Sequence, residues 1–439
     1  MARVLDLHPD DFASELGAHG GRAALFRDHA HDRMVASATW LAPLADWLND
    51  ERRDMHRHEA VLFAIGAKTG VLFSAFLHST VRGQGAGGVR HWPYARLEAL
   101  VRDGLRLSLG MARKNALAGL WWGGGKGIIA RRDDAPWRDP EYRRTLYREY
   151  GAFTSSLRGV YITAEDAGTT PPDMAAVFET TRFVTCISPS AGGSGNPSHP
   201  TARGVVSAME AALDHLGRGP LAGKTIAMQG AGNVAGFMID ELLARGCRRI
   251  VATDISVERC AELRARHPAD VVEIRRVDAG DRTIFAEPCD IFAPNALGGV
   301  LEPETIAALR TGIVCGAANN QLLDDRRDDR LLAERGIAYV PDFVANRMGI
   351  VTCANEQYGS LPDDPAIERH FDRSRADSIF AITQRVLERA AREGITTAAA
   401  ANALADEACS VPHPLWGHRS RAILEALQRE GYGRDPGDA

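Results

Sequence analysis

The feature that most constrains the fold of this 439-residue chain is a regular alternation of helix-like and strand-like segments after residue 200. A helical pattern at 201–216 precedes the apolar run TIAMQG. Helices at 234–245 and 257–266 separate this run from RIVATD and CDIFAP, and the strand-like runs IVCGAAN and IAYVPDFV follow. Strands that alternate with helices are typical of a parallel sheet covered by helices. This part of the chain is therefore predicted to form an α/β domain.

The first strand of this domain ends in the sequence GAGNVA at 230–235, which opens the next helix. Gly230 permits a tight turn, Gly232 allows a pyrophosphate to approach the helix N-terminus, and Ala235 allows the helix to pack closely on the strand. Asp254 ends RIVATD, where a carboxylate can bind both ribose hydroxyls of NAD and repel the 2′-phosphate of NADP. The alternative is that Asp254 only caps the following helix. The pattern predicts a Rossmann domain that binds NAD.

The other segments are less regular. Residues 1 to about 55 have helical spacing and form a predicted N-terminal extension, followed by a strand at 71–81, a helix at 94–115 and a short strand at 159–163. The segment 186–200 is rich in Ser, Gly and Pro, which is typical of a linker. These patterns predict a substrate-binding and oligomerisation domain at 1–197, a Rossmann domain at 198–355, and C-terminal helices at 356–439 that return to the first domain.

Composition excludes several classes of function. The net charge of −5 and the pI of about 6.3 give no electrostatic basis for binding nucleic acid or an anionic membrane. The seven cysteines show neither a C-x-x-C pair nor metal-ligand spacing, so we expect reduced thiols in a cytoplasmic protein and no metal site. The longest apolar run, 60–77, contains Lys68 and two glycines, so we expect a core segment and not a membrane span. The N-terminus has no apolar signal region, so we expect no secretory signal.

Three ionisable residues stand in unusual surroundings. Lys126 lies in LWWGGGKGIIA, where the spacing does not match a phosphate-binding loop. Lys114 lies in GMARKNALAGL and Asp166 lies in ITAEDAGTT. Each alone has an ordinary explanation, such as a glycine-rich turn with a surface lysine, a solvated helix face, or a turn before glycine. Only their combination points to chemistry.

These three motifs occur in a fixed order with several others. The others are GAGGVR at 85–90, TAEDAGT at 163–169, GGSGNPSHPTARGV at 192–205, GAGNVA, CDIFAPNALGGVL at 289–301, GAANNQL at 316–322 and VPDFVANRMGIVTCANE at 340–356. Together they resemble the glutamate, leucine, phenylalanine and valine dehydrogenases, and most closely the branch that acts on apolar amino acids. The resemblance implies a two-domain α/β fold with an active-site cleft between the domains. It also implies a homo-oligomer built through the first domain.

The resemblance implies the reversible oxidative deamination of an L-amino acid to a 2-oxo acid and ammonia. Lys126 matches the general base, and Asp166 matches the carboxylate that exchanges protons with the substrate nitrogen. Lys114 matches the lysine that binds the substrate α-carboxylate, and Asn346 matches an asparagine beside the substrate and the nicotinamide. Burial and a nearby ammonium, which Lys114 would supply, are expected to lower the pKa of Lys126.

The same resemblance indicates the substrate class. Ala86 stands where the glutamate enzymes carry a lysine, so glutamate would leave a buried charge unpaired. We expect a bulky apolar substrate, with phenylalanine or tryptophan favoured over leucine or valine because Ala86 is small. The expected substrate-binding residues are Lys114, Gly87, Gly88, Asn346, Ala86, Met111, Ala164, Ile350 and Cys353. The expected cofactor-binding residues are Gly230, Gly232, Asn233, Val234, Asp254, Ile255, Ala317, Asn319 and Asn346.

Two departures from the family pattern leave an alternative open. Arg347 and Met348 replace an Ala-Gly pair, which would place bulk beside the substrate, and Trp121 and Trp122 are expected to be core residues. A catalytically silent relative that binds NAD or an amino acid as a regulatory subunit would tolerate such changes. The presence of Lys114, Lys126 and Asp166 together argues against this alternative.

Overall fold

The computed structural model describes residues 4–359, 361 and 363–438, which form two compact units. Within these residues, the first unit comprises 4–195, 353–359 and 407–438, and the second comprises 196–352, 361 and 363–406. The division differs from the predicted one at the C-terminal end, where only the last helical segment belongs to the first unit. The reason is helix α14 (Ile379–Glu393), whose apolar face packs against α6 (Ser198–His215) in the second unit.

The first unit is built on a mixed sheet of eight strands in the order β2-β1-β3-β4-β7-β5-β8, with β6 paired to β7. The strands are β1 (Arg22–Asp28), β2 (Arg33–Ala36), β3 (Ala60–Ile65), β4 (Leu72–Ser79), β5 (Gly85–Ala86), β6 (Val89–Trp92), β7 (Gly123–Ala130) and β8 (Tyr161–Ile162). Pairs among β1 to β4 and the β4–β7 pair are antiparallel, whereas β5 and β6 run parallel to β7.

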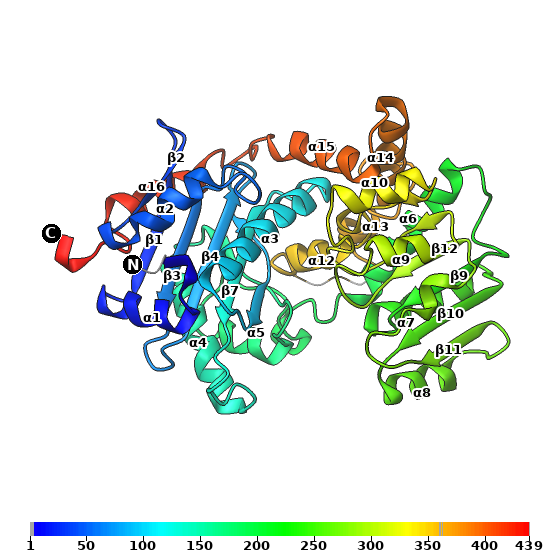
Figure 1. Cartoon of the computed structure of the whole chain (residues 1–439), viewed down its shortest axis with the longest axis horizontal. Coiled ribbons are helices and arrows are strands. Elements are labelled where there is room, and N and C mark those ends of the chain that lie inside the picture. Colours follow the sequence, from blue (N-terminus) through cyan, green and yellow to red (C-terminus); the bar gives the residue numbers. More distant parts are fainter. Residues whose placement is uncertain (1–3, 360, 362, 439) are drawn as a thin grey trace. The chain divides into compact units, whose positions relative to one another are not determined.

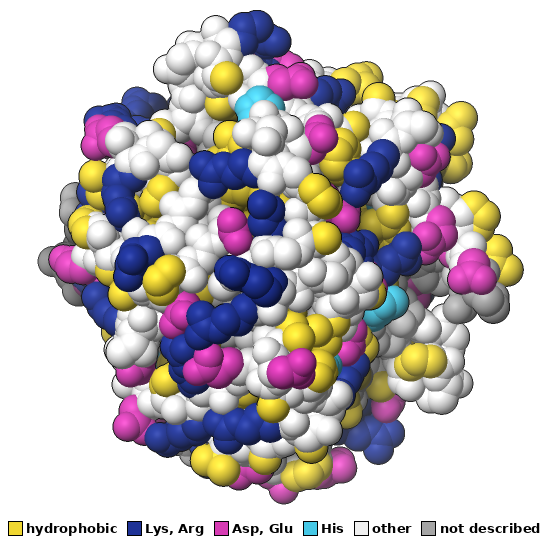
Figure 2. Space-filling view, turned by 90° about the vertical axis from the view of Figure 1, so that its right-hand side faces the viewer, with side chains coloured by type: hydrophobic (Ala, Val, Ile, Leu, Met, Phe, Trp, Pro, Cys, Tyr) yellow, Lys and Arg dark blue, Asp and Glu magenta, His cyan; other side chains and the backbone are white. Residues whose placement is uncertain are grey.

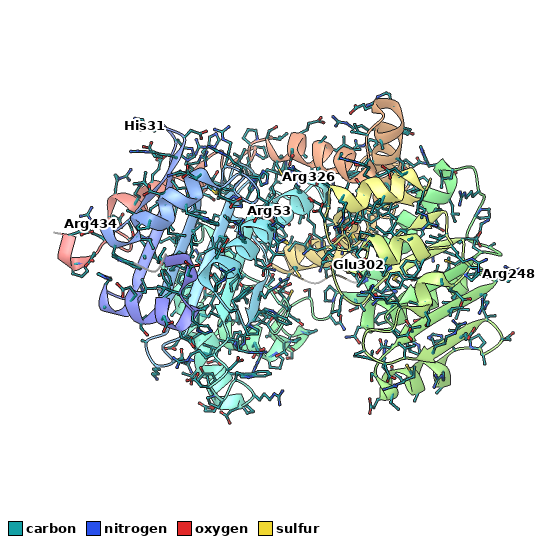
Figure 3. The ribbon with its side chains drawn as sticks, viewed as in Figure 1. His31, Arg53, Arg248, Glu302, Arg326 and Arg434 are labelled. Atoms are coloured by element: carbon teal, nitrogen blue, oxygen red, sulfur yellow. The ribbon has the colours of Figure 1, made fainter. Side chains whose placement is uncertain are left out.

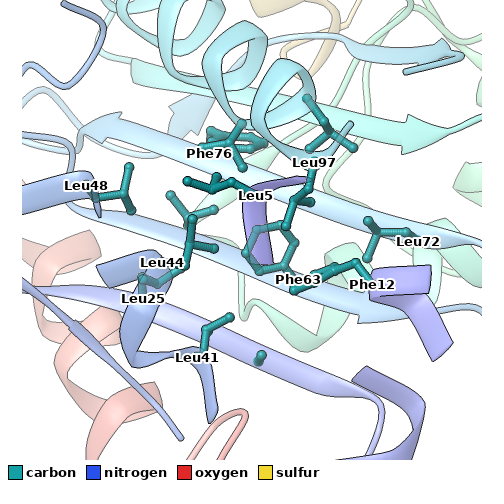
Figure 4. Close-up of a cluster of buried hydrophobic side chains, with 14 of the residues drawn as sticks. Leu5, Phe12, Leu25, Leu41, Leu44, Leu48, Phe63, Leu72, Phe76 and Leu97 are labelled. Carbon is teal, nitrogen blue, oxygen red and sulfur yellow. The ribbon is translucent and has the colours of Figure 1, made fainter. Parts of the chain in front are cut away.

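The N-terminal extension was predicted to be helical, and this prediction is wrong in part. It contains α1 (Pro9–Ala18) and α2 (Ala42–Asp50), but β1 and β2 lie between them. The run Ala23–Phe26 is buried because β1 pairs along its length with β3, so pairing within the sheet outweighs the helical spacing. The helices then cover one face of the sheet, and side chains of helices and strands together form a core cluster that includes Leu5, Phe12, Leu44, Phe63 and Phe76 (Figure 4).

Helix α3 (Leu97–Leu117) lies against β7 at very close range. A Cβ atom at Gly124 would lie 2.3 Å from the Ser108 carbonyl oxygen, and one at Gly104 would lie 2.3 Å from the Phe76 ring. The glycines of the WWGGGKG segment therefore belong to the strand itself, where they admit the helix, and do not form a turn before it. Helices α4 (Pro140–Ser156), α5 (Pro171–Phe178) and α16 (Arg419–Arg429) complete this unit.

The second unit is a six-stranded parallel sheet in the order β11-β10-β9-β12-β13-β14 (Figure 1). The strands are β9 (Thr225–Gln229), β10 (Arg249–Asp254), β11 (Val272–Arg276), β12 (Ile291–Pro294), β13 (Ile313–Val314) and β14 (Ala338–Tyr339). The helices are α6, α7 (Asn233–Ala244), α8 (Val257–Arg266), α9 (Pro303–Ala308), α10 (Arg327–Glu334), α11 (Asp342–Ala345), α13 (Pro365–Glu368), α14 and α15 (Thr397–Cys409), while α12 (Met348–Glu356) runs from this unit into the first. The predicted α/β alternation is confirmed.

This strand order places a topological switch point between β9 and β12, because the chain runs outward in opposite directions from these two neighbours. Ligands of such sheets bind outside the carboxyl ends of the strands at this point. Glu302 and Thr305 form a capping box at the start of α9, whereas Arg248 donates to Thr225 at the opposite, amino end of β9; Figure 3 labels Glu302 and Arg248. The fold therefore positions a candidate site at the β9–β12 edge.

Basic and acidic side chains are interspersed over the face shown in Figure 2. Among the described helices, none combines the length and apolar character needed to span a bilayer. No disulfide links the seven cysteines, all of which lie in the described part of the chain.

Candidate active site

Lys126 and Asp166 form a close ion pair in the first unit. Lys126 lies in the middle of β7, opposite Phe76 on β4, and its side chain is only 4% exposed. Asp166 lies in the loop after β8, where Thr169 Oγ1 accepts a hydrogen bond from the Asp166 amide at 2.8 Å. Lys126 Nζ lies 2.8 Å from Asp166 Oδ2. The structure thus brings together the two residues assigned to catalysis, which are distant in sequence.

Arg90 completes this cluster and was not assigned from the sequence. It lies in β6, and its Nε donates to Asp166 Oδ2 at 3.1 Å while its Nη1 donates to Asp103 Oδ2 at 2.9 Å. Tyr94 Oη donates to the same Asp103 oxygen at 2.6 Å. The GAGGVR motif ends in Arg90, so the signal was present, but a sequence cannot show which carboxylate an arginine reaches.

The cluster shifts the pKa values of both members of the pair. Burial lowers the pKa of Lys126, Asp166 opposes this shift, and the positive charge of Arg90 adds to it. Burial alone would raise the pKa of Asp166, but Lys126 and Arg90 together lower it to about 2. The positive charge that the structure shows lowering the pKa of Lys126 is the guanidinium of Arg90. The sequence had suggested the ammonium of Lys114 for this effect, and that part stays a prediction. Lys114 itself lies on α3 and is half-buried.

Lysine is scarce in this protein. Of 52 Lys and Arg residues only four are lysines, at 68, 114, 126 and 224, and two of these are the predicted active-site lysines. Arginine remains protonated at any pH that proteins meet, whereas a buried lysine can lose its proton. At position 126 the protein therefore has a buried cation that can become neutral.

The expected glycines lie directly against this cluster. A Cβ atom at Gly88 would lie 2.9 Å from Asp166 Cβ, and one at Gly87 would lie 1.9 Å from the Gly125 carbonyl oxygen. The Gly87 amide donates to Ile162 at 3.1 Å, and the Val89 amide donates to Ala164 at 2.8 Å. Any side chain at these two glycines would push the β5–β6 connection away from the ion pair.

The remaining expected substrate residues divide between the two units. Ala86 and Ala164 are buried in the first unit, and Met111 Cγ would lie 2.9 Å from a Cβ atom at Gly87. Cys353 on α12 is also buried in the first unit, where its Sγ lies 2.8 Å from Cys186 Sγ. Ile350 is buried in the second unit.

The glycine-rich turn of the second unit has the geometry that dinucleotide binding requires. Gly230 has φ +94°, and its Cβ would lie 2.8 Å from the Ala296 amide nitrogen, so only glycine fits. A Cβ at Gly232, by contrast, would meet no atom within 4 Å, which leaves the approach to the N-terminus of α7 open. Asn233 and Val234 form the first turn of that helix.

Asp254 holds this turn in place. Its Oδ2 accepts from the Ala231 amide at 2.9 Å, and its Oδ1 accepts from the Ser256 amide at 2.9 Å. The cap of α8 is Ser256, which accepts from Arg259, so the helix-capping alternative for Asp254 is not what the structure shows. Ile255 beside it is 60% exposed, which is unusual for a large apolar side chain.

Three buried polar atoms near the carboxyl ends of β9 and β12 have no hydrogen-bond partner among the described residues. They are Gln229 Oε1, Asn295 Nδ2 and Asn346 Oδ1. The side-chain amide of Asn346 is otherwise fixed, because its Nδ2 donates to the Ala317 carbonyl at 2.9 Å and to Asn319 Oδ1 at 2.8 Å. Unpaired buried polar atoms are costly, so these atoms fit a polar ligand such as a nicotinamide carboxamide.

The residues that depart from the family pattern have different surroundings. Arg347 and Met348 are both fully buried in the second unit, where Arg347 Nη2 contacts His370 Nδ1 at 3.1 Å and the Asp377 carbonyl. That they place bulk beside the substrate stays a prediction. Trp122 is a core residue as predicted, but Trp121 is 41% exposed. Its ring is covered by the Arg82 guanidinium at 4.4 Å, which explains how an exposed tryptophan is accommodated.

Comparison with known proteins supports one family. A model described as Glutamate/Leucine/Phenylalanine/Valine dehydrogenase matches residues 192–410, and one described as Glu/Leu/Phe/Val dehydrogenase, dimerisation domain, matches residues 65–183. Leucine dehydrogenase from Bacillus cereus is 40% identical over 358 residues, which cover 81% of this chain and 92% of that protein. Valine dehydrogenase from Streptomyces albus is 39% identical over 81% of this chain and 93% of that protein.

A solved structure leads to the same conclusion. The crystal structure of L-tryptophan dehydrogenase from Nostoc punctiforme matches with a TM-score of 0.66 and 30% identity, over 83% of this chain and 97% of that one. The matched regions contain the buried ion pair, the glycine-rich turn and the unpaired polar atoms described above. The chain therefore belongs to the Glu/Leu/Phe/Val dehydrogenase family of amino acid dehydrogenases, which use a nicotinamide cofactor.

Proposed function

We propose that this protein catalyses the NAD-dependent, reversible oxidative deamination of a bulky apolar L-amino acid to its 2-oxo acid and ammonia. The observation that carries the proposal is the buried Lys126–Asp166 pair, with its 2.8 Å contact. A buried lysine with a lowered pKa beside an ionised carboxylate is the arrangement that general acid–base chemistry needs.

Each member of the pair has a distinct role. A nicotinamide cofactor, when bound, would supply the acceptor for a hydride from the substrate Cα. The resulting substrate imine must then be attacked by water. Neutral Lys126 accepts a proton from that water at Nζ, and its charged form stabilises the oxygen that becomes the carbonyl. Asp166 exchanges protons with the substrate nitrogen through a carboxylate oxygen, which allows the amine to depart as ammonia.

Other residues bind and orient the reactants. Lys114 pairs with the substrate α-carboxylate, and the bare backbone at Gly87 and Gly88 lets the substrate approach the ion pair. Asn346 Oδ1 accepts a hydrogen bond from a bound amide or amine, which satisfies its unpaired state. Asp254 favours NAD over NADP because a carboxylate at the end of β10 binds the ribose hydroxyls and repels a 2′-phosphate.

The substrate side chain is apolar and large. Ala86, Ala164 and Cys353 are small, buried and uncharged, so no group here would pair with the distal carboxylate of glutamate. The relatives named above act on leucine, valine and tryptophan, and the small side chain of Ala86 favours an aromatic substrate among these. The match of 65–183 to a dimerisation domain supports a homo-oligomer built through the first unit. The cysteine spacing in the sequence, without a C-x-x-C pair, supports a cytoplasmic location.

The test is to follow NADH formation with a panel of L-amino acids at alkaline pH. We expect turnover with phenylalanine, tryptophan, leucine or valine and none with glutamate. Measurable NAD binding with no turnover across the panel would instead support a regulatory relative. Glutamate as the preferred substrate would refute the assigned pocket.

A further inference from the structure

We infer that Arg90 is a positioning residue that keeps Asp166 anchored while Lys126 is neutral. The inference rests on the proposed function, because it concerns the state in which Lys126 acts as a base. It starts from one geometric fact: the Lys126 ammonium and the Arg90 guanidinium both bond to Oδ2 of Asp166, at 2.8 and 3.1 Å. Neither bond occupies Oδ1, which leaves that oxygen available for the substrate nitrogen.

The two cations that hold Asp166 differ in permanence. Lys126 must lose its proton to act as a base, and its attraction to Asp166 falls at that moment. Arg90 cannot lose its proton in the accessible pH range, so its bond to Oδ2 persists. Without Arg90, the carboxylate would be held only by a group that gives up its charge during each turnover.

Arg90 is itself fixed by an independent anchor. Its Nη1 donates to Asp103 on α3, and Tyr94 Oη donates to the same Asp103 oxygen. The guanidinium thus spans two carboxylates from opposite ends, with most of its side chain buried. A lysine at position 90 would keep the charge but could not reproduce the two directed bonds, because an ammonium lacks the planar fork.

Charge and geometry can therefore be separated with two variants. Arg90→Gln removes a positive charge beside Lys126, so the acid limb of the kcat profile should move to higher pH, and kcat at its plateau should fall by roughly 10–100-fold. Arg90→Lys should leave the acid limb near its wild-type position, yet lower the plateau by a similar factor. The charged groups that act on Lys126 are Asp166, Arg90 and Asp103, and Tyr94 donates a hydrogen bond to Asp103.

Two further variants guard against a purely structural explanation. Asp103→Asn keeps Arg90 but removes one anchor and one negative charge, so the plateau should fall while the acid limb moves to lower pH, opposite to Arg90→Gln. Arg102→Gln is the matched control, because Arg102 lies on α3 next to Asp103 but pairs with Asp54 and Glu98. It should lower the melting temperature without moving the limb.

The outcomes are distinguishable. A wild-type enzyme with no activity on the panel would refute the proposed function, and no conclusion about Arg90 would survive it. An active wild type with unchanged plateau and limb in folded Arg90→Gln and Arg90→Lys would overturn the inference alone. If Arg90→Gln does not fold, the opposite shift in Asp103→Asn decides: a plateau and limb at wild-type values would overturn it.

Discussion

The two candidate sites treat their polar groups in opposite ways. In the first unit the charged side chains bond to one another in the order Lys126, Asp166, Arg90 and Asp103. In the second unit the β9–β12 edge keeps Gln229 Oε1, Asn295 Nδ2 and Asn346 Oδ1 buried and unpaired among the described residues. The first arrangement shifts the pKa values of Lys126 and Asp166, whereas the second leaves buried polar atoms that a polar ligand would satisfy.

The contrast indicates that the two units of a dehydrogenase can have separate tasks. In the first unit the pKa of Lys126 is shifted before any ligand arrives, because the groups that shift it belong to the protein. Unpaired atoms do the reverse, since their cost is relieved only when a ligand binds. Substitutions in the first unit should therefore change chemistry, and substitutions in the second should change cofactor binding.

The largest expected effect is that of Lys126→Ala. Loss of the general base should lower kcat by about 10³-fold, while NAD affinity measured by calorimetry stays within twofold. Lys68→Ala is the matched control, because Lys68 is an exposed lysine of the same unit. Near-normal turnover in folded Lys126→Ala would contradict the assignment of proton transfer to the first unit.

Asn346→Ala should produce the converse result. Removal of the unpaired Oδ1 and of the bonds to Ala317 and Asn319 should weaken NAD binding by roughly tenfold, which corresponds to one charge-neutral hydrogen bond. Asn49→Ala serves as the control, because Asn49 bonds only to the Met34 backbone in the first unit. Unchanged NAD affinity in Asn346→Ala would show that the unpaired oxygen has no ligand.

The smallest expected effect is that of Asp254→Ala on cofactor choice. The ratio of kcat/KM for NAD to that for NADP should fall several-fold, and NAD affinity should also fall because the Ala231 amide loses its acceptor. Asp290→Ala, at the opposite end of β9, should leave the ratio unchanged. An unaltered ratio in Asp254→Ala would mean that other residues discriminate between the cofactors.

How much of this could be predicted also differs between the two regions. The second unit was predictable because parallel strands and crossover helices alternate in the sequence. Strand β11 was missed because it lies at the edge of the sheet and its sequence, VEIRR, has few apolar residues. In the first unit, β1 and β2 were missed because β1 pairs with β2 and with the distant β3, and this pairing overrides local spacing. Long-range pairing is not encoded in any one segment.

The candidate site shows the same limit. Lys126 and Asp166 could be chosen by resemblance, but the role of Arg90 depends on which carboxylates the fold brings within 3.1 Å. The burial of Trp121 was predicted wrongly for a similar reason. A residue type indicates what chemistry is available, whereas burial and direction come only from packing.

The central claim is that Lys126 is poised to lose its proton, and its titration can be measured directly. Because the chain has only four lysines, protein labelled with ¹³C at lysine Cε gives few NMR signals, and Lys126→Arg identifies the one that matters. We predict that Lys126 titrates clearly below the ordinary lysine pKa of about 10.4, while exposed Lys68 serves as the internal reference. A Lys126 midpoint at or above that of Lys68 would contradict the account.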